Sequence, residues 1–105
     1  MSSLEQFMDT EDPVWGSAVE VERRNRIKLS IAAYAYEFEN TSIMSDSEFD
    51  DLAKTIDVNL STGNSRLDKF FKENFSEFTG QWIHKHPERN KLKAIYSKYY
   101  RKPKK

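Results

Sequence analysis

The sequence contains no cysteine, so neither disulfide bonds nor thiolate metal sites are available to it. Its longest apolar run covers only residues 31–36, far short of the ~20 residues that a membrane-spanning helix needs. The first residues are acidic, whereas a secretory signal begins with bases. We therefore expect a cytoplasmic protein of one domain that crosses no membrane.

Glycine is also scarce, and its three residues form neither a phosphate-cradling loop nor a nucleophile elbow. The two histidines, His84 and His86, stand two positions apart, and a metal would need further ligands from elsewhere in the chain. We therefore expect no catalytic residues, no metal, no cofactor and no enzymatic activity.

Acids and bases balance at 17 each, but they are segregated along the chain. Residues 1–22 carry six acids and no base, whereas residues 85–105 carry nine bases and a single acid, Glu88. Either the two ends are solvated and attract each other weakly, or the basic end meets nucleic acid or an acidic protein surface. The composition predicts a flexible acidic arm over residues 1–16, a helical domain over residues 17–100 and a basic tail over residues 101–105.

No alternating strand pattern occurs, so the predicted fold is all-α, a small helical bundle built on an antiparallel helical hairpin. Ser17 with Glu20, and Ser45 with Glu48, have the spacing of capping boxes. They predict one helix from there to about residue 38 and a second over about residues 46–57, joined by a short loop. The predicted apolar face of the first helix consists of Ile27, Ile31, Tyr34, Ala35 and Phe38.

Two further helices are predicted in the second half of the chain. Ser65 with Asp68 resembles the start of a third helix. Pro87 suits the first turn of a basic C-terminal helix, because its missing amide hydrogen is not needed there. Between them, an irregular aromatic segment is predicted to lie across the bundle through Phe78, Trp82 and Ile83. The apolar residues of the last helix are Leu92, Ile95, Tyr96 and Tyr99.

The second predicted helix carries two acids, Asp46 and Asp50, on a face separate from its apolar stripe. The helix dipole accounts for Asp46, which lies in the first turn. It accounts less well for Asp50, one turn further on, and Tyr36 is a candidate hydrogen-bond donor to this carboxylate.

The stretch AYAYEFENTSIMSDSEFDDL, residues 33–52, resembles the N-terminal helical subdomain of NAD-dependent bacterial DNA ligases. In that family a tyrosine-rich helix and a short loop precede a signature of the form (S/P)-D-(A/S)-E-Y-D-x-L. The KHPE at residues 85–88 is similar to a Lys-His-Pro-Glu that often follows the signature. The resemblance implies that Tyr36, Asp46 and Asp50 bind nicotinamide mononucleotide.

The sequence departs from the ligase pattern at several positions. Glu37 stands where the ligases usually carry histidine, and Phe49 replaces the signature tyrosine. The adenylation motif Lys-x-Asp-Gly is absent from the sequence. The resemblance therefore implies at most a catalytically inert module that binds NAD or nicotinamide mononucleotide.

The stretch STGNSRLDKFFKENFSEFTGQWIHKHPE, residues 61–88, resembles short phage-encoded proteins that join such a hairpin to an aromatic TGxWI segment. This resemblance implies a small non-enzymatic interaction protein that binds and modulates a host protein or complex, for instance as an inhibitor in DNA metabolism or defence. Trp15 and Trp82 are candidate partner contacts, and aromatic residues leave a homodimer open as an alternative.

The basic end offers a second kind of contact. Candidate residues for binding nucleic acid or an acidic partner are Lys91, Lys98, Arg101 and Lys102. Lysines that contact phosphates make binding salt-dependent, and tyrosines stack on unpaired bases. The alternative is that Tyr96 and Tyr99 belong to the core.

Overall fold

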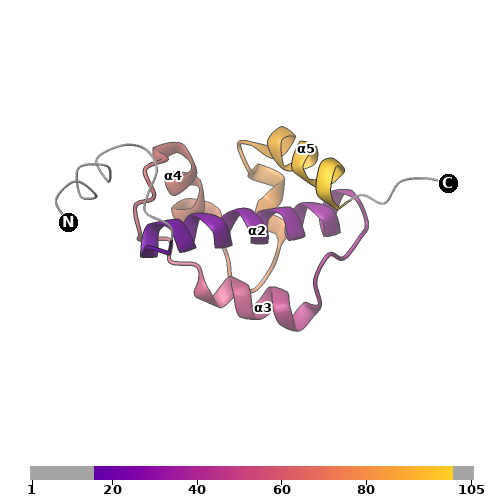
Figure 1. Cartoon of the computed structure of the whole chain (residues 1–105), viewed down its shortest axis with the longest axis horizontal. Coiled ribbons are helices and arrows are strands. Elements are labelled where there is room, and N and C mark those ends of the chain that lie inside the picture. The colour runs from indigo at the N-terminus through magenta and orange to yellow at the C-terminus, as the bar shows by residue number, and fades with distance from the viewer. Residues whose placement is uncertain (1–15, 101–105) are drawn as a thin grey trace.

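The computed structural model describes residues 16–100 and shows no strand in that range, which confirms the predicted all-α class (Figure 1). The elements are α2 (Ala18–Phe38), α3 (Asp46–Thr55), α4 (Ser65–Asn74), the 3-10 helix η1 (Gln81–Lys85) and α5 (Arg89–Tyr99). Within the described range, none of these helices has the length and apolar character needed to cross a membrane. The predicted contacts Trp15, Arg101 and Lys102 lie outside the described residues.

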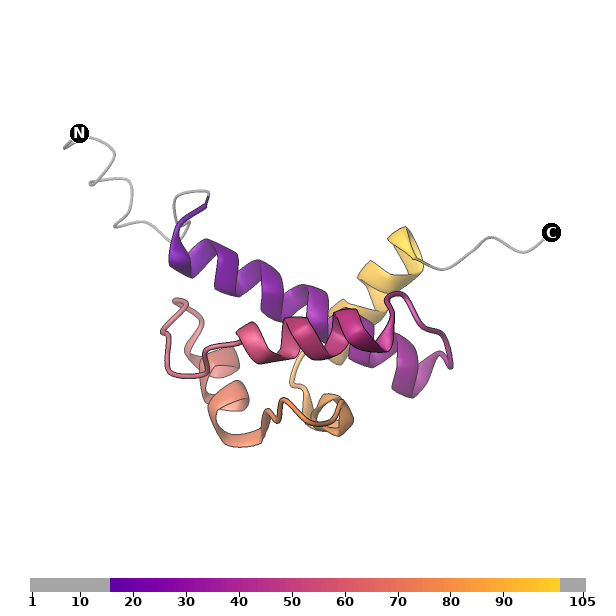
Figure 2. The ribbon, with the colours of Figure 1, turned by 90° about the horizontal axis from the view of Figure 1, so that it is seen from below.

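The long helix α2 is the centre of the fold, and α3, η1 and α5 all pack against it. Figure 2 shows α3 running back along α2 in the opposite direction, as the short loop between them predicts. Residues 29–35 of α2 are all buried, because other elements cover the helix on more than one side. The buried apolar residues outside α2 are Ala53, Phe70, Phe71, Trp82, Ile83, Leu92 and Tyr96.

The predicted apolar face of α2 is only partly right. Ile31, Tyr34 and Ala35 are buried, but Ile27 is 48% exposed and Phe38 is 39% exposed. Ile27 lies just before the buried stretch of residues 29–35, and Phe38 lies just after it.

The capping box that begins α3 is complete. The Ser45 hydroxyl accepts a hydrogen bond from the Glu48 amide over 3.1 Å, and the Glu48 carboxylate accepts one from the Ser45 amide over 2.8 Å. This second bond is the main cause that holds the pKa of Glu48 below its ordinary value. The helix ends at Thr55, two residues before the expected end.

The capping box predicted for α2 is only half formed. Ser17 accepts from the Glu20 amide over 3.2 Å, but the Glu20 carboxylate accepts from the amide of Gly16 rather than from Ser17. Gly16 has a φ of +83°, a conformation that glycine adopts without steric cost. The helix nevertheless spans the predicted residues and ends at Phe38.

The predicted start of α4 has a different cap. Asn64, not Ser65, is the N-cap residue, and its side chain accepts a hydrogen bond from the Leu67 amide over 3.1 Å. Asp68 faces back toward Thr62, whose amide and hydroxyl both donate to its carboxylate. The helix therefore begins at Ser65, where the sequence predicts a helix start, but Asn64 supplies its cap.

Three predictions for the last third of the chain need correction. Phe78 is 87% exposed rather than laid on the bundle, and Tyr99 is 67% exposed rather than in the core. Pro87 precedes α5 instead of lying in its first turn, since the helix begins at Arg89. Trp82 and Ile83, by contrast, are buried in η1 as the sequence predicts.

Candidate functional site

Tyr36, Asp46 and Asp50 line one pocket of about 280 Å³. We call this pocket the acidic pocket; the end of α2, the first turns of α3 and the segment 78–81 form its walls. The complete capping box begins α3 at Asp46, and Asp50 lies four residues further on, so both aspartates lie on the same side of the helix. The three residues that the ligase resemblance identifies are thus neighbours in space.

The charge of the acidic pocket is of one sign. Glu37 lines it together with the two aspartates, and no lysine or arginine is among the lining residues, all of which belong to the described part of the chain. The Glu37 carboxylate is held by Nε2 of His84 at 2.8 Å. Among residues 16–100, the side chains of Tyr36, Asp46 and Asp50 have no hydrogen-bond or ion-pair partner, so the expected bond between Tyr36 and Asp50 is not formed.

Two aromatic rings stand at the acidic pocket in contact with solvent. Phe78 is 87% exposed and Tyr36 is 64% exposed. An exposed phenylalanine adds nothing to core burial, and aromatic rings are enriched at interfaces where they contact a partner. In the sequence Phe78 belongs to an aromatic segment, for which the pattern predicts a position across the bundle rather than in solvent.

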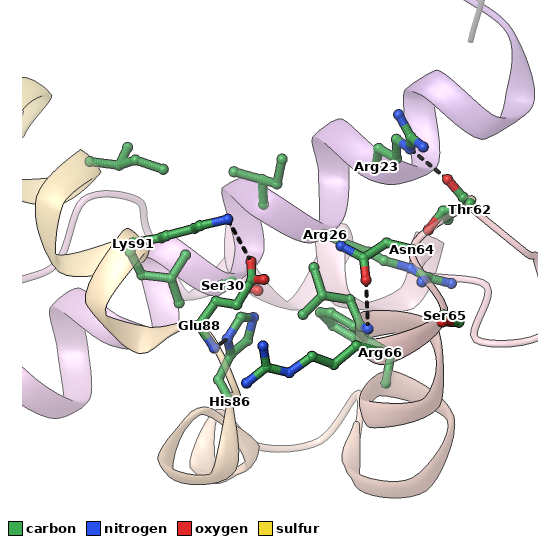
Figure 3. Close-up of a pocket in the computed structure, with 16 residues that line it drawn as sticks. Arg23, Arg26, Ser30, Thr62, Asn64, Ser65, Arg66, His86, Glu88 and Lys91 are labelled. Atoms are coloured by element: carbon green, nitrogen blue, oxygen red, sulfur yellow. Dashed lines mark hydrogen bonds and ion pairs between the residues drawn. The ribbon is translucent and has the colours of Figure 1, made fainter. Parts of the chain in front are cut away.

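A second, larger cavity of about 630 Å³ lies between the first half of α2, residues 62–67 and α5. We call it the basic cavity; Figure 3 shows the side chains that line it. Its cationic lining residues are Arg23, Arg26, Arg66 and Lys91, and its acidic lining residue is Glu88. It shares no lining residue with the acidic pocket.

Of the site residues predicted from sequence, only Lys91 lines the basic cavity. Its ammonium group lies 3.7 Å from the Glu88 carboxylate, and its side chain is 75% exposed. Arg23 and Arg66 are far from Lys91 in the sequence, and the three residues form no recognisable motif. Only the packing of α2, α4 and α5 brings these three bases to one cavity.

The remaining predicted contact residues have distinct surroundings. Lys98 is exposed, and its ammonium group lies 5.2 Å from the centre of the Tyr99 ring. Trp82, expected to contact a partner, is instead 4% exposed and packs against Phe71 and Phe75, so its ring is inaccessible in this fold.

The two histidines lie in different surroundings. The His84 ring contacts Phe38 and the Glu37 carboxylate, whereas His86 is buried beside Phe70 and lines the basic cavity. Among the residues described, no group of three or more potential ligand side chains is placed to hold a metal ion.

Comparison with known proteins adds no assignment: no family model, no curated protein and no solved structure matches this chain. The function must therefore be argued from the two sites themselves.

Proposed function

We propose that this chain is a small non-enzymatic interaction protein that uses the acidic pocket to bind a basic segment of a partner protein. One observation carries the proposal: three carboxylates and two exposed aromatic rings share one pocket whose lining contains no base. An arginine or lysine side chain entering there meets the Asp46 and Asp50 carboxylates, which accept charge-assisted hydrogen bonds. Its cation also meets the Tyr36 or Phe78 ring.

The same charge argues against a phosphate-bearing ligand. Glu37, Asp46 and Asp50 would repel a phosphate group, and the pocket lining has no base to offset them. The positive pyridinium ring of nicotinamide mononucleotide fits the pocket better than its phosphate does. Binding of this nucleotide is therefore a second candidate function, favoured by the convergence of Tyr36 with the two aspartates.

The resemblance of residues 61–88 to short phage proteins supports a host protein as the partner. In that setting a compact protein without catalytic machinery modulates its target by occupying a surface of it. The exposed Phe78, in the middle of the resembling stretch, supplies the apolar contact that a buried ring would not.

The α5 surface supports a further candidate, association with nucleic acid. Tyr99 is 67% exposed beside Lys98, which leaves its ring available to stack on an unpaired base. Fluorescence anisotropy with single-stranded oligonucleotides at two salt concentrations tests this candidate. Salt-sensitive binding that is lost in Tyr99→Ala would favour it over the protein partner.

The proposed function is tested by capture from bacterial lysate with mass spectrometry, using matched variants of the full chain. The double variant Asp46→Asn with Asp50→Asn removes two charges from the acidic pocket. The control is Asp51→Asn, which removes the charge of an exposed residue that does not line the pocket. We expect the same partner on the wild-type chain and on Asp51→Asn, and about tenfold weaker capture by the double variant.

Unchanged capture by the double variant would rule out the acidic pocket as the contact. Calorimetry with nicotinamide mononucleotide at millimolar concentration separates the two candidate ligands. Heat of binding that disappears in the double variant, together with no captured protein, would favour the nucleotide instead. Phe78→Ala adds a second check, because loss of capture there requires no change of charge.

A further inference from the structure

The basic cavity has the size and the lining of a small-molecule site. Its volume of about 630 Å³ lies within the range of known ligand pockets, and such pockets are mostly apolar with a few placed polar groups. Its apolar lining residues are Ile27, Leu67, Phe71, Leu92 and Ile95. Polar groups from α2, from α4 and from the segment before α5 converge on this apolar surface (Figure 3).

One of those polar groups is buried and unused. Ser30 is 1% exposed, and its hydroxyl has no hydrogen-bond partner among the residues described. Leaving a buried hydroxyl unpaired is unfavourable, and native structures rarely do so without a reason. Ser30 lies in the wall of the basic cavity, where a bound ligand can supply the missing partner.

His86 supplies a second donor. Its Nδ1 accepts a hydrogen bond from the Glu88 amide over 3.0 Å, so the neutral ring must carry its proton on Nε2. Burial, chiefly, together with the positive charges of Arg66 and Arg89, lowers the pKa of His86 to about 4, which keeps the ring neutral near pH 7. The ring therefore offers one fixed N–H donor.

The charges of the lining favour an anion. All three nitrogens of the Arg26 guanidinium already donate hydrogen bonds, to Glu22, to Asp68 and to two backbone carbonyls, so Arg26 contributes structure rather than a free charge. Arg66 is exposed, and a single 3.3 Å bond to the Pro87 carbonyl holds it.

Two further bases remain at the cavity. Lys91 is held only by the 3.7 Å pair with Glu88, the one acid in the lining. Arg23 donates from Nε to the Thr62 carbonyl, which leaves its terminal N–H groups for a ligand. The basic cavity is thus lined by three bases that have N–H groups free for a ligand and by one carboxylate.

We propose that the basic cavity binds a small organic anion with an apolar ring or chain. The apolar body lies against the Leu92 and Phe71 side of the cavity. The anionic group is bound by Arg66 and Lys91, with Ser30 and His86 as neutral donors. This site is independent of the acidic pocket, so failure of either proposal leaves the other standing.

The proposal is tested by isothermal titration calorimetry of the full chain with three probes. 2-Naphthoate carries both an apolar body and a charge, 2-naphthamide keeps the body without the charge, and inorganic phosphate has charge alone. We expect 2-naphthoate to bind at least about tenfold more tightly than 2-naphthamide, and phosphate not to bind detectably. Equal affinity for the two naphthalene probes, or no binding of 2-naphthoate at millimolar concentration, overturns the proposal.

Variants then locate the binding. Arg66→Gln with Lys91→Gln should weaken 2-naphthoate about tenfold while changing 2-naphthamide less than about threefold. Ser30→Ala, which keeps nearly the same volume, should weaken 2-naphthoate by about threefold or more.

The control is Lys93→Gln, an exposed lysine of α5 that does not line the cavity, and it should bind like the wild-type chain. Circular dichroism confirms that each variant is folded. Wild-type affinity in the Arg66 and Lys91 double variant would place the probe elsewhere and overturn the proposal.

Discussion

The Arg26 guanidinium donates a hydrogen bond from Nη1 to the Asp68 carboxylate over 2.8 Å, joining residues that are 42 positions apart. Its Nε donates to Glu22 over 2.7 Å, and its Nη2 donates to the carbonyl oxygens of Asp57 and Leu60. The Arg26 side chain is only 5% exposed. One buried side chain therefore ties α2 to the loop after α3 and to the first turn of α4.

Removal of that side chain should be strongly destabilising. Arg26→Met leaves the Glu22 and Asp68 carboxylates in the same place without their cation, and we expect the free energy of unfolding to fall by about 3 to 5 kcal/mol. The control is Arg24→Met, which removes a half-exposed arginine whose pair with Glu20 spans 3.7 Å, and it should cost less than about 1 kcal/mol. Urea denaturation followed by circular dichroism measures both, and equal losses would show that the buried cluster is not a stabilising centre.

The N-cap of α4 gives a test between adjacent residues. Asn64→Ala removes the side chain that accepts from the Leu67 amide, and it should lower the free energy of unfolding by about 1 kcal/mol. Ser65→Ala changes an exposed residue at the first helical position and should have an effect below about 0.5 kcal/mol. The reverse order, measured by thermal or urea unfolding, would make Ser65 rather than Asn64 the cap of α4.

The stability of the fold should decline in mild acid because of His86. Its pKa is lowered to about 4 in the folded state from an ordinary 6.5, mainly by burial, so the unfolded chain binds a proton first as the pH falls. The contribution of His86 to the free energy of unfolding is complete above 6.5, the pKa of histidine in the unfolded chain. It is lost as the pH decreases from 6.5 toward 4. From about pH 7.5 to about pH 5 this one group should remove about 2 kcal/mol.

His86→Gln provides the comparison, because glutamine does not titrate and its carbonyl can still accept from the Glu88 amide. The free energy of unfolding of this variant, measured by urea titration at each pH, should fall about 2 kcal/mol less over the same interval. An unchanged pH dependence in the variant would assign the acid sensitivity to other groups.

Asp68 extends the acid sensitivity to lower pH. Burial alone would raise the pKa of Asp68, but hydrogen bonds from Thr62 and Arg26 outweigh burial and lower it below its ordinary 3.8. The stability that these bonds give is present above that ordinary value and is lost as the pH falls through the lowered pKa. Asp68 therefore acts in a lower pH interval than His86, and His86→Gln should leave its contribution in place.

Short sequence patterns predict the helix starts well where all the interacting residues lie close together in the sequence. Ser45 with Glu48 identified the start of α3, because both halves of that capping box lie within four residues. At Ser65 the same spacing does not form a capping box, because the Asp68 carboxylate accepts from Arg26, 42 positions away, and from Thr62, which stands just before the helix. The two serines thus have acids at the same spacing, but only the acid of the second pair is bound by a residue distant in the sequence.

The two candidate sites differ in the same way. Tyr36, Asp46 and Asp50 were identified from one short stretch, because a hairpin brings the end of one helix beside the start of the next. The basic cavity was not predicted, since Arg23, Arg66 and Lys91 come from three separate elements. Their convergence depends on how α4 and α5 pack on α2, which no spacing in the sequence encodes.

The aromatic segment before α5 allows a last prediction that separates core from surface within six residues. Ile83 is fully buried, and Ile83→Ala should reduce the free energy of unfolding by about 2 to 5 kcal/mol, because it removes apolar contacts and leaves a cavity. Phe78 is 87% exposed, and Phe78→Ala should change stability by less than about 0.5 kcal/mol.

Urea unfolding of the two variants decides whether Phe78 is free for a partner. Wild-type stability in Phe78→Ala means that the ring does not hold the fold together, so any loss of partner capture in that variant reflects the contact itself. A large loss of stability in Phe78→Ala would show that the ring packs in the core. The acidic pocket would then lack the exposed ring on which the proposed interface depends.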